Sequence, residues 1–182
     1  MCQIQSARAV VITLPGLFPQ TQCPALLTKA AMRLVLFQPD IPQNAGSMLR
    51  LAACLGVAVD VIEPCGFVWD ERRMRRAVMD YLDLAEVERH SSWAAYRAQP
   101  RGRLVLLTTA GDLSCHHFCF RPEDSIMVGR ESAGVPEEVH ATADARVVLP
   151  LRPGARSLNV ALAAAMALSE ALRQTDLLPN GL

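Results

Sequence analysis

The chain has no excess charge of one sign, almost no lysine and no long apolar run. Its 18 basic and 18 acidic residues give a formal net charge of zero, and Lys29 is the only lysine. A strongly basic domain that coats nucleic acid is therefore excluded, and any RNA contact must use a small, shaped footprint. No apolar run reaches the roughly 18 residues of a membrane-spanning helix, so we expect no membrane partner. The 182 residues, 51% of them hydrophobic, suit one globular domain.

The cysteines lack the regular spacing of a disulfide framework. A chain with this many core residues does not need disulfides, so we interpret them as free thiols in a reducing cytoplasm. They are Cys2, Cys23, Cys54, Cys65, Cys115 and Cys119. The run Cys115-His116-His117-Phe118-Cys119 is compatible with half of a zinc site. Because a structural zinc site usually needs a second ligand pair and the sequence offers none, we expect no metal.

Residues 1–31 lack the periodicity of the rest of the chain. Their short apolar stretch, residues 9–14, is followed by proline and glycine. It has neither the long apolar core nor the cleavage site of a secretory signal. We therefore expect a poorly structured extension, or a translation start at Met32. A domain over residues 32–175 and a tail over residues 176–182 would follow.

From residue 32 onward, short apolar strands alternate with helical patterns. Several strand candidates are continuous apolar runs, which suits strands that are buried on both faces of a sheet. The candidates are residues 33–37, 57–62, 84–88, 103–109, 125–129 and 146–149. Caps and periodicity predict helices from Asn44 to Leu55 before Gly56, Asp70 to about Tyr81, Ser91 or Ser92 to Arg97, from Pro136, and from Ser157 to about Gln174. The alternation predicts a single α/β domain with a mostly parallel sheet.

Three segments place polar residues where a strand ends and a helix begins. In open α/β sheets, ligands bind at that edge. Taken singly, each segment has an ordinary explanation, because helix caps and β-turn-α connections use the same residue types. A glycine at the end of a strand also admits a close approach of ligand to backbone, and a helix start offers free N–H groups. The segments are residues 40–50 with Asn44 and Arg50, 126–136 with Gly129 and Glu131, and 149–160 with Ser157 and Asn159.

Together, in this order, the three segments resemble the three motifs of the SpoU (TrmH) branch of the SPOUT methyltransferases. The resemblance covers residues 32 to about 175. Further stretches, residues 37–44, 62–67 and 75–81, are similar to a subgroup of small enzymes that methylate the wobble ribose of tRNA. The resemblance implies helices on both faces of the sheet and a C-terminal trefoil knot, which strand alternation alone would not predict. Two residues depart from the family pattern, Ala133 and Ala161.

The resemblance implies an enzyme that uses S-adenosyl-L-methionine to methylate a ribose 2′-hydroxyl. The implied substrate is the wobble nucleotide, cytidine or uridine 34, in the anticodon stem-loop of tRNA, with leucine isoacceptors expected. The enzyme would be a cytoplasmic homodimer that needs no metal. Two alternatives remain: the same transfer at another tRNA position or on rRNA, and a catalytically silent RNA-binding α/β protein.

The motif positions also imply the site residues. The catalytic set is Asn44, Arg50, Glu131 and Asn159. We expect Arg50 to orient the ribose or its phosphate and to stabilise charge, because a guanidinium does not readily lose its proton. Cofactor binding is implied for Leu107, Thr108, Gly129, Leu149, Ser157 and Leu158. Candidate RNA contacts are the arginines Arg152, Arg156, Arg72 and Arg76, of which the last two could equally form a solvated, ion-paired helix face.

Overall fold

The computed structural model describes residues 32–179, except for residues 71, 73, 75–80, 82, 83 and 100. The expectations for residues 1–31, for most of the helix between Asp70 and Tyr81 and for the end of the tail lie outside the described residues. In the part that is described, none of the helices is both long and apolar enough to cross a bilayer.

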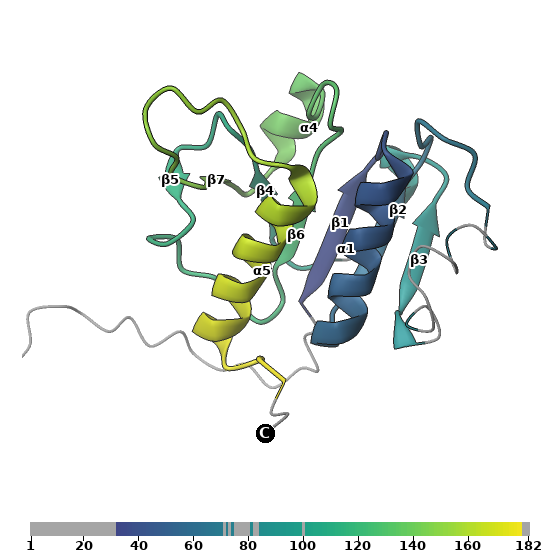
Figure 1. Cartoon of the computed structure of the whole chain (residues 1–182), viewed down its shortest axis with the longest axis horizontal. Helices are drawn as coiled ribbons and strands as arrows, with labels where there is room; N and C mark the ends of the chain where they lie inside the picture. Colours follow the sequence, from purple (N-terminus) through teal and green to yellow (C-terminus); the bar gives the residue numbers. More distant parts are fainter. Residues whose placement is uncertain are drawn as a thin grey trace, which may run out of the picture.

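One sheet of seven parallel strands organises the described part of the chain (Figure 1). Its strand order is β3-β2-β1-β6-β4-β7-β5. Strands β1 and β6 are neighbours; β2 and β3 lie on the side of β1, and β4, β7 and β5 lie on the side of β6. All carboxyl ends therefore lie at one edge, and that edge is where an open parallel sheet binds ligands. The strands are β1 Arg33–Phe37, β2 Ala58–Ile62, β3 Val87–His90, β4 Leu104–Leu107, β5 Leu113–Ser114, β6 Ser125–Val128 and β7 Ala145–Val148.

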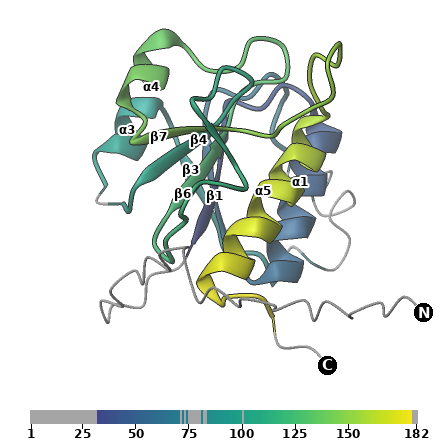
Figure 2. The same cartoon turned by 90° about the vertical axis from the view of Figure 1, so that its left-hand side faces the viewer.

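Helices cover both faces of the sheet, as expected. Helices α1 and α5 lie on one face, and α3 and α4 lie on the other (Figure 2). The helices are α1 Pro42–Leu55, α3 Trp93–Arg97, α4 Glu137–Thr142 and α5 Val160–Thr175.

Two hydrophobic cores, one on each face, explain this layering. Successive side chains of a strand point to opposite faces, so β1 contributes to both cores. Leu34 and Leu36 are buried in the core beneath α1 and α5. Val35 and Phe37 are buried in the smaller core that contains Tyr96 of α3. The continuous apolar runs in the sequence therefore mark strands with no solvent-facing side.

The strand expectations differ from the structure at two places. The strand expected at residues 84–88 runs from Val87 to His90, and His90 lies 2.8 Å from the buried Asp60 of β2, a contact that the local sequence does not reveal. Strand β5 was not expected at all. Its two residues pair with β7 and are too short to show any periodicity.

Two helix boundaries are confirmed. Gly56 ends α1 in the left-handed conformation with φ 67°, which glycine adopts readily. The hydroxyl of Ser92 accepts a hydrogen bond from Ala95 N at 3.1 Å and caps α3.

Three helix starts were expected wrongly. Helix α1 begins at Pro42 rather than after Asn44, and Pro136 precedes α4 as its N-cap instead of opening its first turn. Helix α5 begins at Val160 with Asn159 as its cap, so Ser157 lies in the preceding loop. Ser157 and Asn159 both have cap chemistry, and Asn159 is the residue that caps α5. The N-cap position of α1 is Ile41, whose side chain makes no capping hydrogen bond.

Candidate active site

A cavity of about 420 Å³ opens at the carboxyl edge of the sheet, where β4, β6 and β7 end. Loops that leave these strands and the N-terminal ends of α1 and α5 form its walls, at the top of Figure 1. The volume lies in the range of small-molecule sites. The lining segments are residues 106–109, 128–131, 134–135, 148–149, 151 and 157–160, together with Ile41, Asn44 and Ala163.

A tight turn between Gly129 and Gly134 shapes one wall of the cavity. Arg130 and Gly134 exchange two backbone hydrogen bonds of 2.9 Å, and Gly134 has a φ of 65°. A Cβ on Gly129 would lie 2.6 Å from the carbonyl carbon of Gly134. This backbone contact by itself requires glycine at position 129, and the expected approach of a ligand to Gly129 stays a prediction.

A chain of side-chain hydrogen bonds joins the three motif segments beside the cavity. Glu131 Oε1 accepts a hydrogen bond from Asn44 Nδ2 at 3.0 Å, and Asn44 Oδ1 accepts one from Asn159 Nδ2 at 3.0 Å. The other carboxylate oxygen, Oε2, accepts a hydrogen bond from the backbone N–H of Asp40 at 2.8 Å. Residues up to 115 positions apart in sequence are thus linked to one carboxylate, Asn44 directly and Asn159 through Asn44.

Helix α5 fixes the donor-to-acceptor direction of this series of hydrogen bonds. The Oδ1 atom of Asn159 accepts hydrogen bonds from Ala161 N at 2.9 Å and Leu162 N at 3.3 Å, so its amide NH₂ points away from the helix. That NH₂ donates to Asn44, whose own NH₂ must then face Glu131. The amide hydrogens of both asparagines therefore point along this series toward the Glu131 carboxylate, which is the final acceptor.

Asp40 is a further residue of this site that the sequence did not single out. Its Oδ2 accepts hydrogen bonds from the backbone N–H of Ser132, at 3.0 Å, and from the Ser132 hydroxyl. These two bonds hold the pKa of the Asp40 carboxyl below its ordinary value. They also attach the turn that carries Glu131 to the end of β1. Only the position of Asp40 at the carboxyl end of β1 could have indicated it.

Most of the residues that the sequence nominated line the cavity. All six cofactor candidates are there: Leu107, Thr108, Gly129, Leu149, Ser157 and Leu158. Asn44, Glu131 and Asn159 line it as well. Arg130 and Val135 also line the cavity. Both lie in the segment 126–136, but they were not expected as site residues.

The nominated arginines lie elsewhere. Arg50 is exposed on α1, outside the cavity lining, with its guanidinium carbon 5.0 Å from the centroid of the Tyr81 ring. Arg152 and Arg156 are exposed on the loop between β7 and α5. Arg72 is exposed, and Arg76 lies outside the described residues, so the RNA contacts expected of these two arginines stay predictions.

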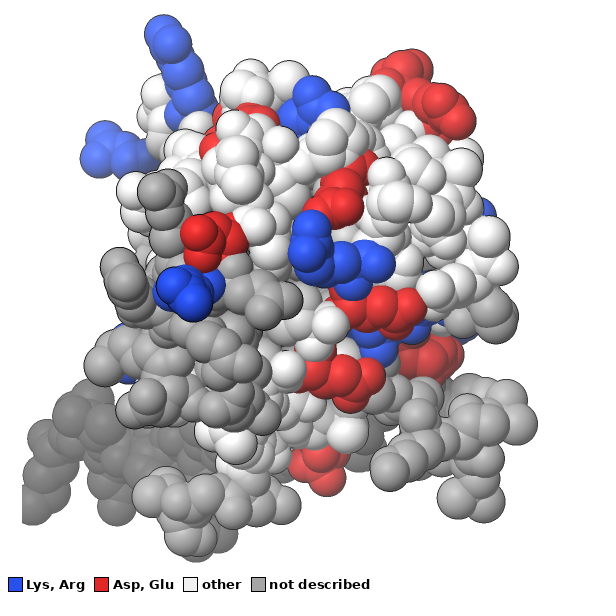
Figure 3. Space-filling model, turned by 90° about the vertical axis from the view of Figure 1, so that its right-hand side faces the viewer, with Lys and Arg blue, Asp and Glu red and all other residues white. Residues whose placement is uncertain are grey.

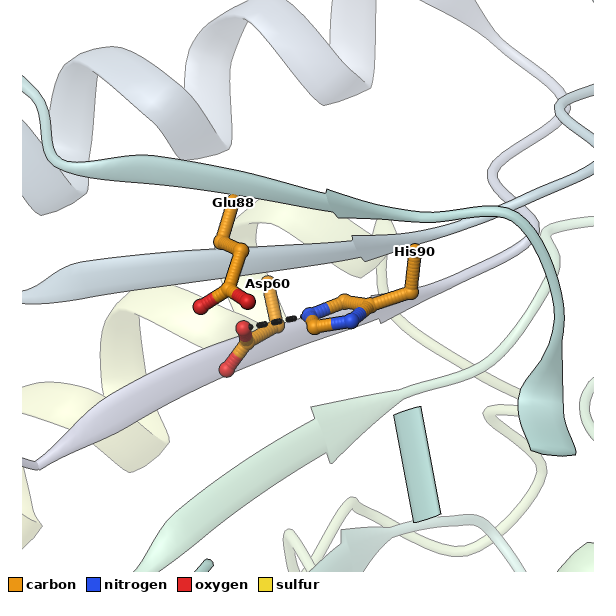
Figure 4. A group of neighbouring side chains, drawn as sticks. All are labelled: Asp60, Glu88 and His90. Atoms are coloured by element: carbon orange, nitrogen blue, oxygen red, sulfur yellow. Dashed lines mark hydrogen bonds and ion pairs between the residues drawn. The ribbon is translucent and has the colours of Figure 1, made fainter. Parts of the chain in front are cut away.

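A buried polar cluster lies on the other face of the sheet, among β1, β2 and β3. Asp60, Glu88 and His90 point toward one another there (Figure 4), and each could offer an atom to a metal ion. Asp60 is fully buried, and its Oδ1 lies 2.8 Å from His90 Nε2. Two arginines already balance the two carboxylates. Arg33 makes two hydrogen bonds to Asp60, of 2.5 and 3.0 Å, and Arg101 lies 3.3 Å from Asp60 and 2.7 Å from Glu88. The cluster is therefore charge-matched without a cation, and we assign it a structural role.

The Cys115–Cys119 run contributes core rather than ligands. Cys115 is fully buried in the core beneath α5, and burial raises the pKa of its thiol to about 11. His116, His117 and Cys119 are exposed. Among the described residues, the run provides no group of three ligands that could share an ion.

A parallel α/β sheet, with a small-molecule cavity at its carboxyl edge and a carboxylate held by amides, defines the class of this protein. It is an α/β domain with a ligand-sized cavity at the carboxyl ends of its strands, the edge where open parallel sheets bind ligands. The model of the SpoU rRNA methylase family matches residues 31–169. The chain therefore belongs to the SpoU rRNA methylase family.

Individual relatives are similar over most of the chain. A tRNA (cytidine(34)-2'-O)-methyltransferase of Beijerinckia indica subsp. indica is 60% identical over 148 residues, which cover 80% of this chain and 92% of the relative. A solved structure described as "Structural insights into the 2-OH methylation of C/U34 on tRNA" has a TM-score of 0.75 and 40% identity, and the match covers 80% of this chain and 96% of that one. The SpoU methyltransferase AviRb from Streptomyces viridochromogenes, in complex with the cofactor AdoMet, has a TM-score of 0.71 and 28% identity, over 81% of this chain and 62% of that one.

Proposed function

We propose that this protein uses S-adenosyl-L-methionine to methylate the ribose 2′-hydroxyl of the wobble nucleotide, cytidine or uridine 34, in tRNA. The observation that carries the proposal is the hydrogen-bonded set Glu131, Asn44 and Asn159 at the edge of the 420 Å³ cavity. The relatives described above, at 60% and 40% identity, bear names or descriptions that state this reaction.

The cavity fits a nucleoside cofactor in size and chemistry. Its apolar walls suit an adenine ring, and the strand ends around it leave backbone groups to read the edges of that ring. Walls of this kind come from Leu107, Val128, Leu149 and Leu158. Ser157 and Thr108 add hydroxyl groups. When bound, S-adenosyl-L-methionine supplies a methyl group that its positive sulfur has already activated.

The polar residues of the cavity would position the reacting hydroxyl. The carboxylate of Glu131 is an acceptor and a negative charge beside a site for a cationic cofactor. Asn44 and the cap residue Asn159 hold that carboxylate in one orientation, so little reorganisation is needed during the reaction. Rate enhancement would come chiefly from holding the 2′-hydroxyl in line with the methyl group.

Exposed apolar residues support a homodimer. Leu162 and Met166 are 60% and 45% exposed and lie one turn apart on α5, next to Leu158 at the cavity. Such a stripe on a helix is typical of a protein interface. An interface there would place residues of a second copy beside the cavity. Arg50 lies outside the cavity of its own chain. Across such an interface it could act at the cavity of the second copy.

Phosphate contacts are proposed for Arg152 and Arg156. Both lie on the loop that also carries Ser157 into the cavity, and their guanidinium groups are exposed. The face at the β3 edge is different. There, acidic and basic side chains are interleaved (Figure 3). Among the side chains that the structure describes there, neither sign predominates, so these side chains would attract the RNA backbone only weakly.

A C-terminal trefoil knot and a cytoplasmic location are also proposed. The segment after β4 lies against β7, where a Cβ on Gly111 would be 2.5 Å from the carbonyl carbon of Val147, and it continues into β5, which pairs with β7. Membership of the SpoU family supports the proposal of a knot. The four cysteines among the described residues form no disulfide, which suits a reducing compartment. An experimentally traced chain and localisation of a fluorescently tagged protein would test these two points.

Methylation of tRNA in vitro tests the main proposal. The purified protein is incubated with S-adenosyl-L-methionine and unmodified tRNA, and the product is mapped by nuclease digestion and mass spectrometry. We expect a 2′-O-methyl group at nucleotide 34. A methyl group at another tRNA position, or on rRNA only, would favour the first alternative. Cofactor binding without any transfer would favour a silent RNA-binding protein.

A further inference from the structure

A second cavity, of about 390 Å³, lies beside the carboxyl ends of β2 and β3. Its walls include Glu63, Phe67 and Trp69 from the loop after β2, and Arg89 from β3. Val68, between the two aromatic residues, is 86% exposed, so this loop projects into solvent. The established family assignment gives this cavity no role.

Two stacked aromatic rings and a neighbouring guanidinium group lie in its wall. The rings of Phe67 and Trp69 lie 6.1 Å apart with an interplanar angle of 20°, and the guanidinium carbon of Arg89 lies 5.1 Å from the Trp69 ring centroid. Both aromatic side chains are partly buried against the core beneath α1, which keeps the stack rigid. Aromatic rings and guanidinium planes are the surfaces on which proteins stack unpaired bases.

The paired charges in this cavity favour the binding of a neutral base over the binding of a phosphate. Arg89 donates two hydrogen bonds to Oε1 of Glu63, one of them 3.1 Å from Arg89 Nε. The carboxylate neutralises the guanidinium, so an anionic phosphate gains little there. A neutral, flat base still gains the stacking contact.

The stacked loop is attached to the active-site segment. Gly66 N donates a 2.9 Å hydrogen bond to Pro39 O, and a Cβ on Gly66 would lie 2.9 Å from Asp40 Cα. The backbone N–H of Asp40 in turn donates to Glu131. The second cavity and the active-site carboxylate are therefore held by the same short segment of chain.

We propose that this cavity binds one unpaired nucleobase of the RNA substrate, stacked against Trp69 and Arg89, close to the nucleotide that is methylated. The inference rests on the proposed function. It assigns recognition of a base to a cavity whose lining arginine, Arg89, is already paired with Glu63, so stacking contributes more there than attraction of a phosphate.

Replacement of Trp69 tests the stacking in the full-length protein. Trp69→Leu should raise the KM for tRNA by about 5- to 100-fold, the range for losing one stacked base. The affinity for S-adenosyl-L-methionine, measured by calorimetry, should stay within about twofold, since Trp69 is absent from the first cavity. Trp93→Leu is the matched control. Trp93 also lies beneath an arginine, Arg97, but on the other face of the sheet, so the KM should stay near that of the unchanged protein.

Tryptophan fluorescence gives a second readout that does not depend on catalysis. Trp69 and Trp93 are the only tryptophans, so Trp93→Phe leaves Trp69 as the sole emitter. An anticodon stem-loop RNA should quench that emission at saturable concentrations, and Trp69→Phe should show no comparable quenching.

The outcomes separate this inference from the proposed function. An unchanged KM for tRNA in a folded Trp69→Leu protein, or no quenching of Trp69 by RNA, would overturn the subsite. Conversion of a dimer to a monomer by Trp69→Leu, seen by analytical ultracentrifugation, would assign the cavity to a second copy and also overturn it. Quenching by RNA without any methyl transfer by the unchanged protein would support the subsite and contradict the proposed function.

Discussion

The side-chain amide of Asn159 is used at both of its ends. Its oxygen accepts hydrogen bonds from the first N–H groups of α5, and its NH₂ group donates to Asn44, which donates to Glu131. Fold and site thus share one residue. A cap residue with only an oxygen would keep the helix but lose the orientation of the amides.

Replacement of Asn159 can separate these two roles. Asn159→Asp keeps the capping oxygen and loses the donor to Asn44, so we expect helix stability to be retained and methyl transfer to fall. Asn159→Ala should lose both, with a cost of about 1 kcal/mol in the free energy of unfolding. Urea denaturation and single-turnover methylation measure the two effects. Equal loss of stability in both variants would contradict the division of roles.

Arg50 is predicted to serve the transfer step rather than cofactor binding. It lies outside the cavity lining, so Arg50→Ala should leave the affinity for S-adenosyl-L-methionine nearly unchanged. The rate of methyl transfer should fall by about 10²–10³, the scale for one charge-stabilising donor. Arg50→Lys should restore little, because an ammonium cannot reproduce the guanidinium fork. Near-normal turnover by Arg50→Ala would remove it from the catalytic set.

At the scale of elements, a buried ion-pair cluster ties three strands together. Asp60 of β2 is paired with Arg33 of β1, His90 of β3 and Arg101 from the loop before β4. Removing one member leaves the others buried and uncompensated, which costs more than the intact pairs contribute. The cluster includes the last residue of β3, His90, two residues beyond the strand expected from local sequence.

Asp60→Ala is therefore predicted to destabilise the fold strongly. Arg33, Arg101 and His90 would lose their shared acceptor, and we expect a loss of about 3–5 kcal/mol in the free energy of unfolding. Glu86→Gln is the control, because Glu86 lies 3.6 Å from the same Arg33 but is 79% exposed. It should change stability by no more than about 0.5 kcal/mol. Chemical denaturation measures both, and similar small effects would contradict a structural role for the cluster.

At the scale of the whole molecule, the methyltransferase domain is proposed to span residues 32–175. The family model covers residues 31–169. The described residues of both cores and of the first cavity lie between Met32 and Leu172.

A protein that begins at Met32 is predicted to retain folding, dimerisation and tRNA methylation. All the contacts described for the cores and the active site would be present in it. Circular dichroism, analytical ultracentrifugation and the methylation assay would compare it with the full chain. Loss of any one of the three properties would show that residues 1–31 contribute to the enzyme.

Helices, strands and cavity residues were predicted correctly where a pattern of neighbouring residues marks them. The apolar runs predicted the strands of the two-faced sheet, and Gly56 and Ser92 predicted helix boundaries. The predictions failed where a residue has a distant partner. Ser157 has the chemistry of a helix cap, but Asn159 takes that place, and its amide also reaches Asn44, 115 residues away.

The α/β class follows from the alternation of strand and helix patterns along the chain. The family and the residues around the first cavity are implied by the resemblance of the three motif segments. The contacts between those residues are visible only in the folded protein. The orientation of Glu131 by two amides, the pairing of Asp60 with two arginines and the stack of Phe67, Trp69 and Arg89 all depend on contacts between separate segments. Such contacts exist only after parallel strands have brought distant loops to one edge of the sheet.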